Sequence, residues 1–90
     1  MQSKTIIGMK KRIQTGVQIQ QTWNSLQGDV SHLYTVEKVQ SNGFFSTRSG
    51  AEQRYWCSFP KRDEVEFTDS GWVRMEDNQK IAEYVWVSNG

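Results

Sequence analysis

Apolar and polar side chains alternate along most of the chain from residue 15 onward. Residues 15–23 read TGVQIQQTW, and Val17, Ile19, Gln21 and Trp23 fall on the same side of an extended backbone. Successive side chains of a strand point to opposite faces of a sheet, so a period of two with one mostly apolar face is typical of a half-buried strand. The pattern therefore predicts a strand over residues 15–23.

The segment before this strand has no single periodicity. In residues 1–14 the apolar side chains do not gather on one face, and Gly8 interrupts them, so the segment fits a short helix, a ragged strand or an arm. The competing interpretation of residues 15–23 is a helix that includes Ile13, Val17 and Leu26. The β-branched residues in that stretch favour the strand.

A β-hairpin is the clearest local prediction. Residues 33–47 contain two β-rich runs that are separated by Asn42 and Gly43. This dipeptide readily adopts the two left-handed conformations that a tight hairpin turn requires, so we expect both residues to lie in the turn. Residues 24–32, just before the hairpin, are rich in turn-forming side chains and predict a loop.

Four further strands are predicted towards the C-terminus. Tyr55, Cys57 and Phe59 share one face of the first of them, which Pro60 ends because proline cannot donate to a ladder. The last run, Tyr84 to Val87, is apolar on both faces, which favours burial on both sides. The predicted strands cover residues 53–59, 64–68, 72–75 and 81–87.

The order of these elements from residue 15 to residue 68 resembles that of small SH3-like barrels. The resemblance covers a first strand, a long turn-rich loop, a tight hairpin and two more short strands, and residues 72–87 add a hairpin to it. The regular spacing of short predicted strands is typical of a small barrel or sandwich. With the resemblance, it predicts a mainly β fold: a small antiparallel barrel with an additional C-terminal β-hairpin, in one domain over residues 15–90. Residues 1–14 form an N-terminal arm or a first element, such as a short helix. A fold-level resemblance carries no function.

Composition limits the class of protein. Ninety residues suffice for one domain, and the four Trp, three Tyr and four Phe supply the apolar area that a small core needs. Cys57 is the only cysteine, so the chain cannot form an internal disulfide. The sequence has no apolar run of membrane-spanning length and no secretory leader pattern. We therefore expect a cytoplasmic protein with no membrane contact.

Residues that could carry catalysis or bind a metal are few. Cys57 and His32 are the only candidates for a thiol dyad, and we expect Cys57 in the core and His32 in an exposed loop. Asp63, Glu64 and Glu66 could form a carboxylate site, but alternation places the two glutamates on a solvent face. No phosphate-binding glycine motif is present. The sequence predicts a protein that is not an enzyme and uses no cofactor and no metal.

Basic and aromatic side chains alternate over two predicted strands and their turns. Such a surface suits stacked bases with neutralised phosphates, and equally the aromatic and arginine contacts of protein interfaces. In the competing interpretation the C-terminal hairpin covers this face, and Trp56 packs under Tyr84 or Trp86. The candidate binding residues are Phe44, Phe45, Arg48, Arg54, Trp56, Lys61 and Arg62.

Two functions follow as hypotheses. The first is a small protein-binding module, an accessory or inhibitor protein of the phage or mobile-element type. The alternative is a single-stranded nucleic-acid-binding protein that also uses the basic start, Lys4 to Arg12. The net charge of +1 favours the protein partner, because nucleic-acid modules concentrate positive charge more strongly. A homodimer through an open C-terminal strand, Tyr84 to Val87, is a third hypothesis.

Overall fold

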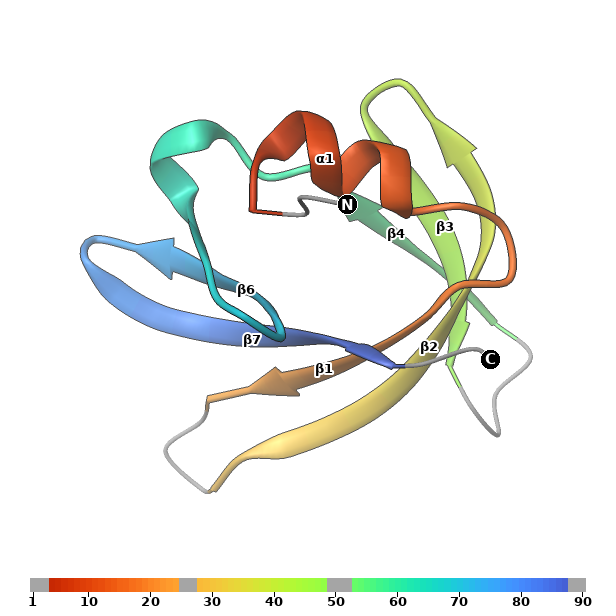
Figure 1. Ribbon diagram of the computed structural model, residues 1–90. Coiled ribbons are helices and arrows are strands. Elements are labelled where there is room, and N and C mark those ends of the chain that lie inside the picture. Colours follow the sequence, from red (N-terminus) through yellow and green to blue (C-terminus); the bar gives the residue numbers. More distant parts are fainter. Residues whose placement is uncertain (1–3, 25–27, 49–52, 88–90) are drawn as a thin grey trace.

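The computed structural model describes residues 4–24, 28–48 and 53–87 (Figure 1). One α-helix precedes a single antiparallel sheet, and a short 3₁₀ helix interrupts the strands. The elements are α1 (Ile6–Arg12), β1 (Gln18–Trp23), β2 (Val30–Gln40), β3 (Gly43–Arg48), β4 (Arg54–Ser58), η1 (Arg62–Glu64), β5 (Val65–Phe67), β6 (Gly71–Glu76) and β7 (Gln79–Val87).

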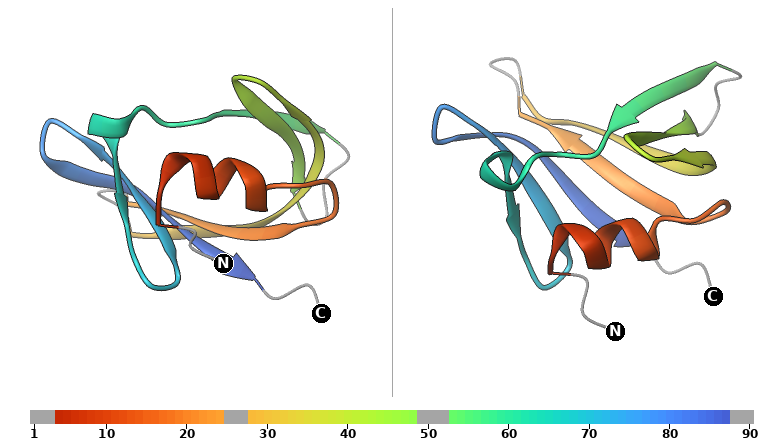
Figure 2. Two further views of the ribbon diagram at one scale, coloured as in Figure 1. Left: turned by 45° about the horizontal axis from the view of Figure 1, so that its top comes forward. Right: turned by 90° about the horizontal axis from the view of Figure 1, so that it is seen from above.

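The seven strands form one curled sheet in the order β4-β3-β2-β1-β7-β6-β5. Every pairing is antiparallel, and the sheet curves into a half-barrel with a concave inner face (Figure 2). The predicted fold class, a mainly β, barrel-like protein with a C-terminal hairpin and a short N-terminal helix, is confirmed. The barrel does not close, because β4 and β5 are the two ends of the sheet in the described chain. We call the gap between these two ends the seam.

The helix lies across one end of the concave face (Figure 2). It begins where Thr5 Oγ1 accepts a hydrogen bond from the Gly8 amide at 2.9 Å, a normal N-cap. Met9, within the helix, and Ile13, just after it, are fully buried against the sheet. The described part of the N-terminal segment therefore packs on the sheet. No helix in the described part of the chain is long and apolar enough to cross a membrane.

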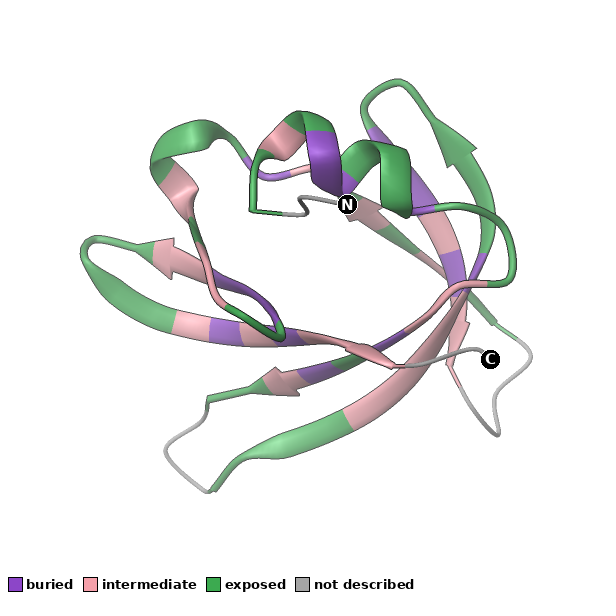
Figure 3. Ribbon diagram, in the orientation of Figure 1, coloured by how far each residue is buried: buried purple, intermediate pink, exposed green. Residues whose placement is uncertain are grey.

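The core lies between α1 and the concave face of the sheet (Figure 3). The inward residues of β1, β2 and β3 follow the predicted alternation, with Ile19, Val36 and Phe44 almost completely buried. Burial of such side chains stabilises the fold by about 1.5–3 kcal/mol each. The buried cluster consists of Met9, Ile13, Ile19, Val36, Phe44, Trp72, Ala82 and Tyr84.

The predicted hairpin is present, but its turn is different. Asn42 lies in the turn, whereas Gly43 is the first residue of β3 and has no positive φ. A Cβ atom at Gly43 would lie 2.4 Å from the Cys57 carbonyl oxygen, so glycine is required here for close packing. The two left-handed turn residues are instead Asp77 (φ 51°) and Asn78 (φ 63°), which connect β6 to β7.

The loop predicted over residues 24–32 is shorter than expected. Val30 to His32 belong to β2, because β1 and β2 stay paired as far as Trp23 and Val30. His32 is consequently a half-buried strand residue and not an exposed loop residue. Leu26, which belonged to the competing helix interpretation, lies outside the described residues.

The C-terminal strand is in the interior of the sheet. β7 is hydrogen-bonded to β1 on one side and to β6 on the other, and Tyr84 to Val87 are buried or half-buried, as predicted. The hypothesis of a homodimer through this strand requires an open edge, and β7 has none between Ala82 and Val85, where both neighbours are paired. The C-terminal hairpin extends the sheet and does not cover its outer face.

Candidate functional site

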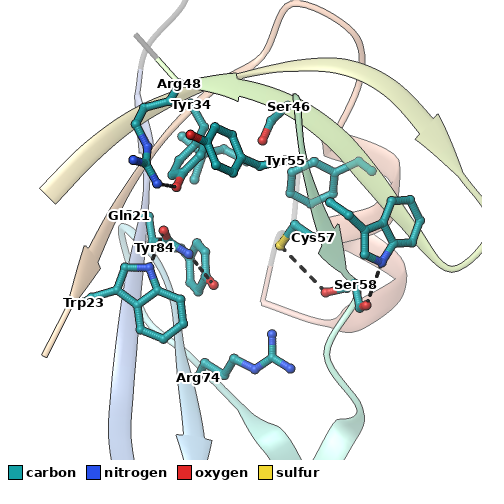
Figure 4. A pocket seen from close by; sticks show the side chains of 13 residues that line it. Gln21, Trp23, Tyr34, Ser46, Arg48, Tyr55, Cys57, Ser58, Arg74 and Tyr84 are labelled. Carbon is teal, nitrogen blue, oxygen red and sulfur yellow. Dashed lines mark hydrogen bonds between the residues drawn. The ribbon is translucent and has the colours of Figure 1, made fainter. Parts of the chain in front are cut away.

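A cavity of about 380 Å³ opens on the concave face at the end that α1 does not cover. Its wall is formed by side chains from six of the strands, so the curvature of the sheet brings together residues that are far apart in the sequence (Figure 4). No residue of α1 lines it. The aromatic residues that line the cavity are Trp23, Tyr34, Phe44, Tyr55, Trp56 and Tyr84.

Arg48 is held at one end of the cavity by two tyrosines. Its guanidinium carbon lies 4.5 Å from the centre of the Tyr55 ring and 5.6 Å from that of Tyr34, and its Nη2 donates to Tyr34 Oη at 3.0 Å. The hydrogen bond to Tyr34 raises the pKa of Arg48 above its ordinary value, so the charge is permanent. The buried Nε has no hydrogen-bond partner among the described residues.

A hydrogen-bonded chain of three side chains forms another wall. Trp23 Nε1 donates to Gln21 Oε1 at 2.6 Å, and Gln21 Nε2 donates to Tyr84 Oη at 2.8 Å. These bonds explain why a glutamine is buried on the apolar face of β1, since buried polar groups require partners. The Tyr84 ring also stacks on Trp72 at 4.8 Å, and burial raises the pKa of its hydroxyl.

Cys57 and Arg74 face each other across the seam, from β4 and β6. Burial raises the pKa of the Cys57 thiol to about 11, and the opposing charge of Arg74 offsets only part of that effect. The thiol is therefore protonated near neutral pH and is a poor nucleophile. His32 does not line the cavity, so the geometry gives Cys57 no neighbouring histidine base there.

The structure divides the candidate binding residues that the sequence suggested among four places. Phe44 and Arg48 point into the concave face, with Phe44 mostly in the core. Phe45 and Arg54 lie on the convex face, since they alternate with the inward residues of the same strands. Lys61 and Arg62 are exposed beyond the end of β4. Trp56 lies at the edge, on the convex face but also at the rim of the cavity.

Trp56 is exposed, so the interpretation in which the C-terminal hairpin covers it is wrong. Its side chain is 41% exposed and its ring lies 4.9 Å from Phe45, its cross-strand neighbour. Lys38 continues this row on β2. Trp86, which we expected as one alternative cover, packs on Trp72 inside the half-barrel.

Sequence reasoning missed most of the cavity wall. Gln21 carried a usable signal, because it is the one polar residue on the apolar face of β1. Tyr34, Tyr55 and Arg74 carried none, because their meeting depends on how strongly the sheet curls. Trp23 was assigned correctly to the inner face, but not to a site.

The outer edge of β4 borders the cavity and has no strand beside it in the described chain. The Phe59 amide donates to Asn42 O, and hydrogen-bonded pairs alternate along an antiparallel ladder. In the register of β3 and β4, the Cys57 amide therefore points towards β3, and the Trp56 and Ser58 amides point away from it. Their outward N–H groups are available to another strand.

Comparison with known proteins gives no family: no protein-family model, curated protein or solved structure matches the chain. Within the described residues no three His, Cys, Asp or Glu side chains gather closely enough to hold a metal ion. The candidate site therefore rests on its own geometry.

Proposed function

We propose that this chain is a non-enzymatic binding module that takes an extended segment of a partner protein along the open edge of β4. The observation that carries the proposal is the position of this edge. It offers outward backbone amides, it borders the cavity on one face, and it presents the exposed ring of Trp56 on the other. Strand addition at a sheet edge gains main-chain hydrogen bonds and reads alternate side chains in pockets.

The two faces beside this edge would contact the added segment in different ways. Side chains of an added strand alternate between faces, so one set would enter the cavity and the other would lie against Trp56 and Phe45. Tryptophan, tyrosine and arginine dominate the binding energy of protein interfaces, and all three surround this edge. An accessory or inhibitor role, as the small size suggests, would use the same contact.

The nucleic-acid alternative has less support from the ring geometry. Arg48 covers the rings of Tyr34 and Tyr55, which meet edge to face with an interplanar angle of 82°. Phe45 and Trp56 pack against each other. Successive bases need a row of open ring faces, and these rings do not provide one. A fluorescent oligonucleotide that bound at low salt and dissociated at high salt would favour this alternative instead.

The proposal is tested with two substitutions at one position. A random ten-residue peptide library is selected on the wild-type protein, and the affinity of the best peptide is then measured on Ser58→Pro and Ser58→Ala. Proline removes the outward N–H that an added strand would use, and an edge strand tolerates it at such a position. We expect Ser58→Pro to weaken binding at least about tenfold, whereas Ser58→Ala, which keeps the N–H, binds like the wild type.

Trp56→Ala gives a second readout and should also weaken the peptide, by about 1–3 kcal/mol if the ring contacts it. Circular dichroism and thermal unfolding establish that each variant is folded. Unchanged peptide affinity in a folded Ser58→Pro protein would contradict strand addition at β4. The free protein is also examined by sedimentation. If the wild type forms dimers and Ser58→Pro is monomeric, the occupant of the β4 edge is a second copy of this chain.

A further inference from the structure

The cavity beside the β4 edge carries positive charge and, among the described residues that line it, no negative charge. Its lining contains Arg48 and Arg74 and no aspartate or glutamate. Neither arginine forms an ion pair with a carboxylate in the part of the chain that the structure describes. Two half-buried guanidinium groups that face one cavity lose part of their hydration, and an anionic group between them would compensate that loss.

Arg48 is already oriented for such a group. The rings of Tyr34 and Tyr55 and the bond to Tyr34 Oη fix its plane, which reduces the side-chain entropy that binding would cost. Its buried Nε lacks an acceptor among the described residues. The guanidinium as a whole is a strong donor for a carboxylate oxygen, because both partners are charged.

Arg74 supplies the second charge from the opposite side of the seam. In Figure 4 its guanidinium reaches towards Cys57 and Ser58, below the Tyr84 ring. The groups that it faces, the Cys57 thiol and the Tyr84 hydroxyl, both have pKa values raised by burial, so both are neutral at physiological pH. No carboxylate among the described residues that line the cavity balances the charge of Arg74.

The size and shape of the cavity favour a carboxylate on a peptide over a nucleotide. Its volume of about 380 Å³ is near the lower end of the range of about 300–1,000 Å³ for ligand sites. A nucleobase would need an open ring face. Arg48 covers one face of Tyr34 and of Tyr55, and Trp72 covers one face of Tyr84, so the most open rings of the lining are Trp23 and Trp56, each 41% exposed. A carboxylate needs only the guanidinium edges.

We propose that the partner segment is acidic, and that an aspartate or glutamate side chain on its inward face enters the cavity and binds Arg48 and Arg74. This inference rests on the proposed function, because it names the chemistry of the segment that β4 receives. The two arginines then act as the specificity-determining residues of the module. The outward face of the segment, against Trp56, has no such requirement.

The test uses small probes that do not need the sheet edge. The Nε–H signals of the arginines are followed by ¹H–¹⁵N NMR during titration with phenylacetate, with neutral phenylacetamide and with adenosine monophosphate, at constant ionic strength. We expect saturable shifts of the Arg48 and Arg74 signals with phenylacetate only. Arg74→Gln should weaken phenylacetate at least about tenfold, whereas Arg54→Gln, on the convex face, should leave it unchanged.

Several results would overturn the inference. The first is that phenylacetamide binds as tightly as phenylacetate, and the second is that phenylacetate causes no saturable shifts. The third is that adenosine monophosphate binds more tightly than phenylacetate, which would identify a nucleotide site. Ser58→Pro separates the two proposals, since it removes an outward amide of the edge and keeps both arginines, although Ser58 itself lines the cavity. Peptides that bind at β4 without any preference for acidic residues would overturn the inference alone. Phenylacetate binding in a protein whose β4 edge accepts no peptide would overturn the proposed function, and with it the acidic segment, and would leave only a carboxylate-binding cavity.

Discussion

The two ends of the concave face are built on the same seven strands but are filled differently. At the end under α1, which we call the covered half, Met9 and Ile13 pack on Trp72 and Phe44, and the remaining cavity measures about 10 Å³. At the other end, the open half, the cavity measures about 380 Å³. There Gln21 is hydrogen-bonded to Trp23 and Tyr84, and Arg48 is hydrogen-bonded to Tyr34.

This difference separates stability from function within one small sheet. Apolar side chains and a helix are sufficient to fill the covered half at the density of a protein interior. The open half contains buried polar groups that are bonded to one another, and two arginines that form no ion pair with a described carboxylate. Such groups are costly for folding alone, so their arrangement is better explained by a ligand than by the core.

The largest effect should come from emptying the covered half. Met9→Ala removes a fully buried side chain beneath α1 and should lower the free energy of unfolding by about 2–5 kcal/mol. Ile7→Ala is the matched control on the same helix. Ile7 is 69% exposed, so its truncation should change stability by no more than about 0.5 kcal/mol. Urea denaturation measures both, and equal effects would show that α1 does not fill the sheet.

The pH dependence of stability should report the buried thiol between the two halves. The pKa of Cys57 is about 11 in the folded state against about 9 in the unfolded chain. Between these values the unfolded state releases the proton first. The contribution of Cys57 to the free energy of unfolding is therefore fully present below pH 9 and declines as the pH rises to 11. The decline should be about 2–3 kcal/mol.

Cys57→Ala is the control for this effect and should show a smaller decline, which leaves the contribution of Tyr84. The same pKa predicts that a disulfide reagent at pH 8 modifies the folded protein about 100-fold more slowly than the urea-unfolded protein, because the thiolate reacts. A native thiol that reacts as fast as the unfolded one would contradict the burial of Cys57.

A smaller effect should follow from breaking the hydrogen-bonded wall of the open half. Tyr84→Phe keeps the ring on Trp72 but leaves the buried Gln21 Nε2 without its acceptor, which should cost about 1–2 kcal/mol. In the double variant Gln21→Leu with Tyr84→Phe, both members of this pair are gone and part of this loss should be recovered, although Trp23 Nε1 then loses its acceptor. Additive losses in this cycle, measured by thermal unfolding, would argue that the two side chains do not interact.

The alternation of side chains predicted the strands well because it depends only on local geometry. It placed Tyr55, Cys57 and Phe59 on one face of residues 53–59, and each of these three packs against the core or lines the cavity, although β4 itself ends at Ser58. Local patterns also predicted the hairpin between β2 and β3, although Gly43 proved to serve close packing and not a turn.

The site required information that the pattern does not contain. The sequence pattern groups Phe44 and Arg48 with Arg54 and Trp56. Successive residues of one strand point to opposite faces, and the register between β3 and β4 decides which side chains share a face. The approach of Arg74 to Cys57 depends on the curl of the whole sheet. No local signal encodes that curl, and for this reason the cavity could not be predicted.

The most direct test of the account is amide hydrogen exchange in the free protein and in its complex with the best selected peptide. The account predicts that exchange of the Trp56 and Ser58 amides slows markedly on binding, while the Cys57 amide, which points to β3, and the Met9 amide in α1 are unchanged. Protection at α1 or β5, with Trp56 and Ser58 exchanging as in the free protein, would contradict it.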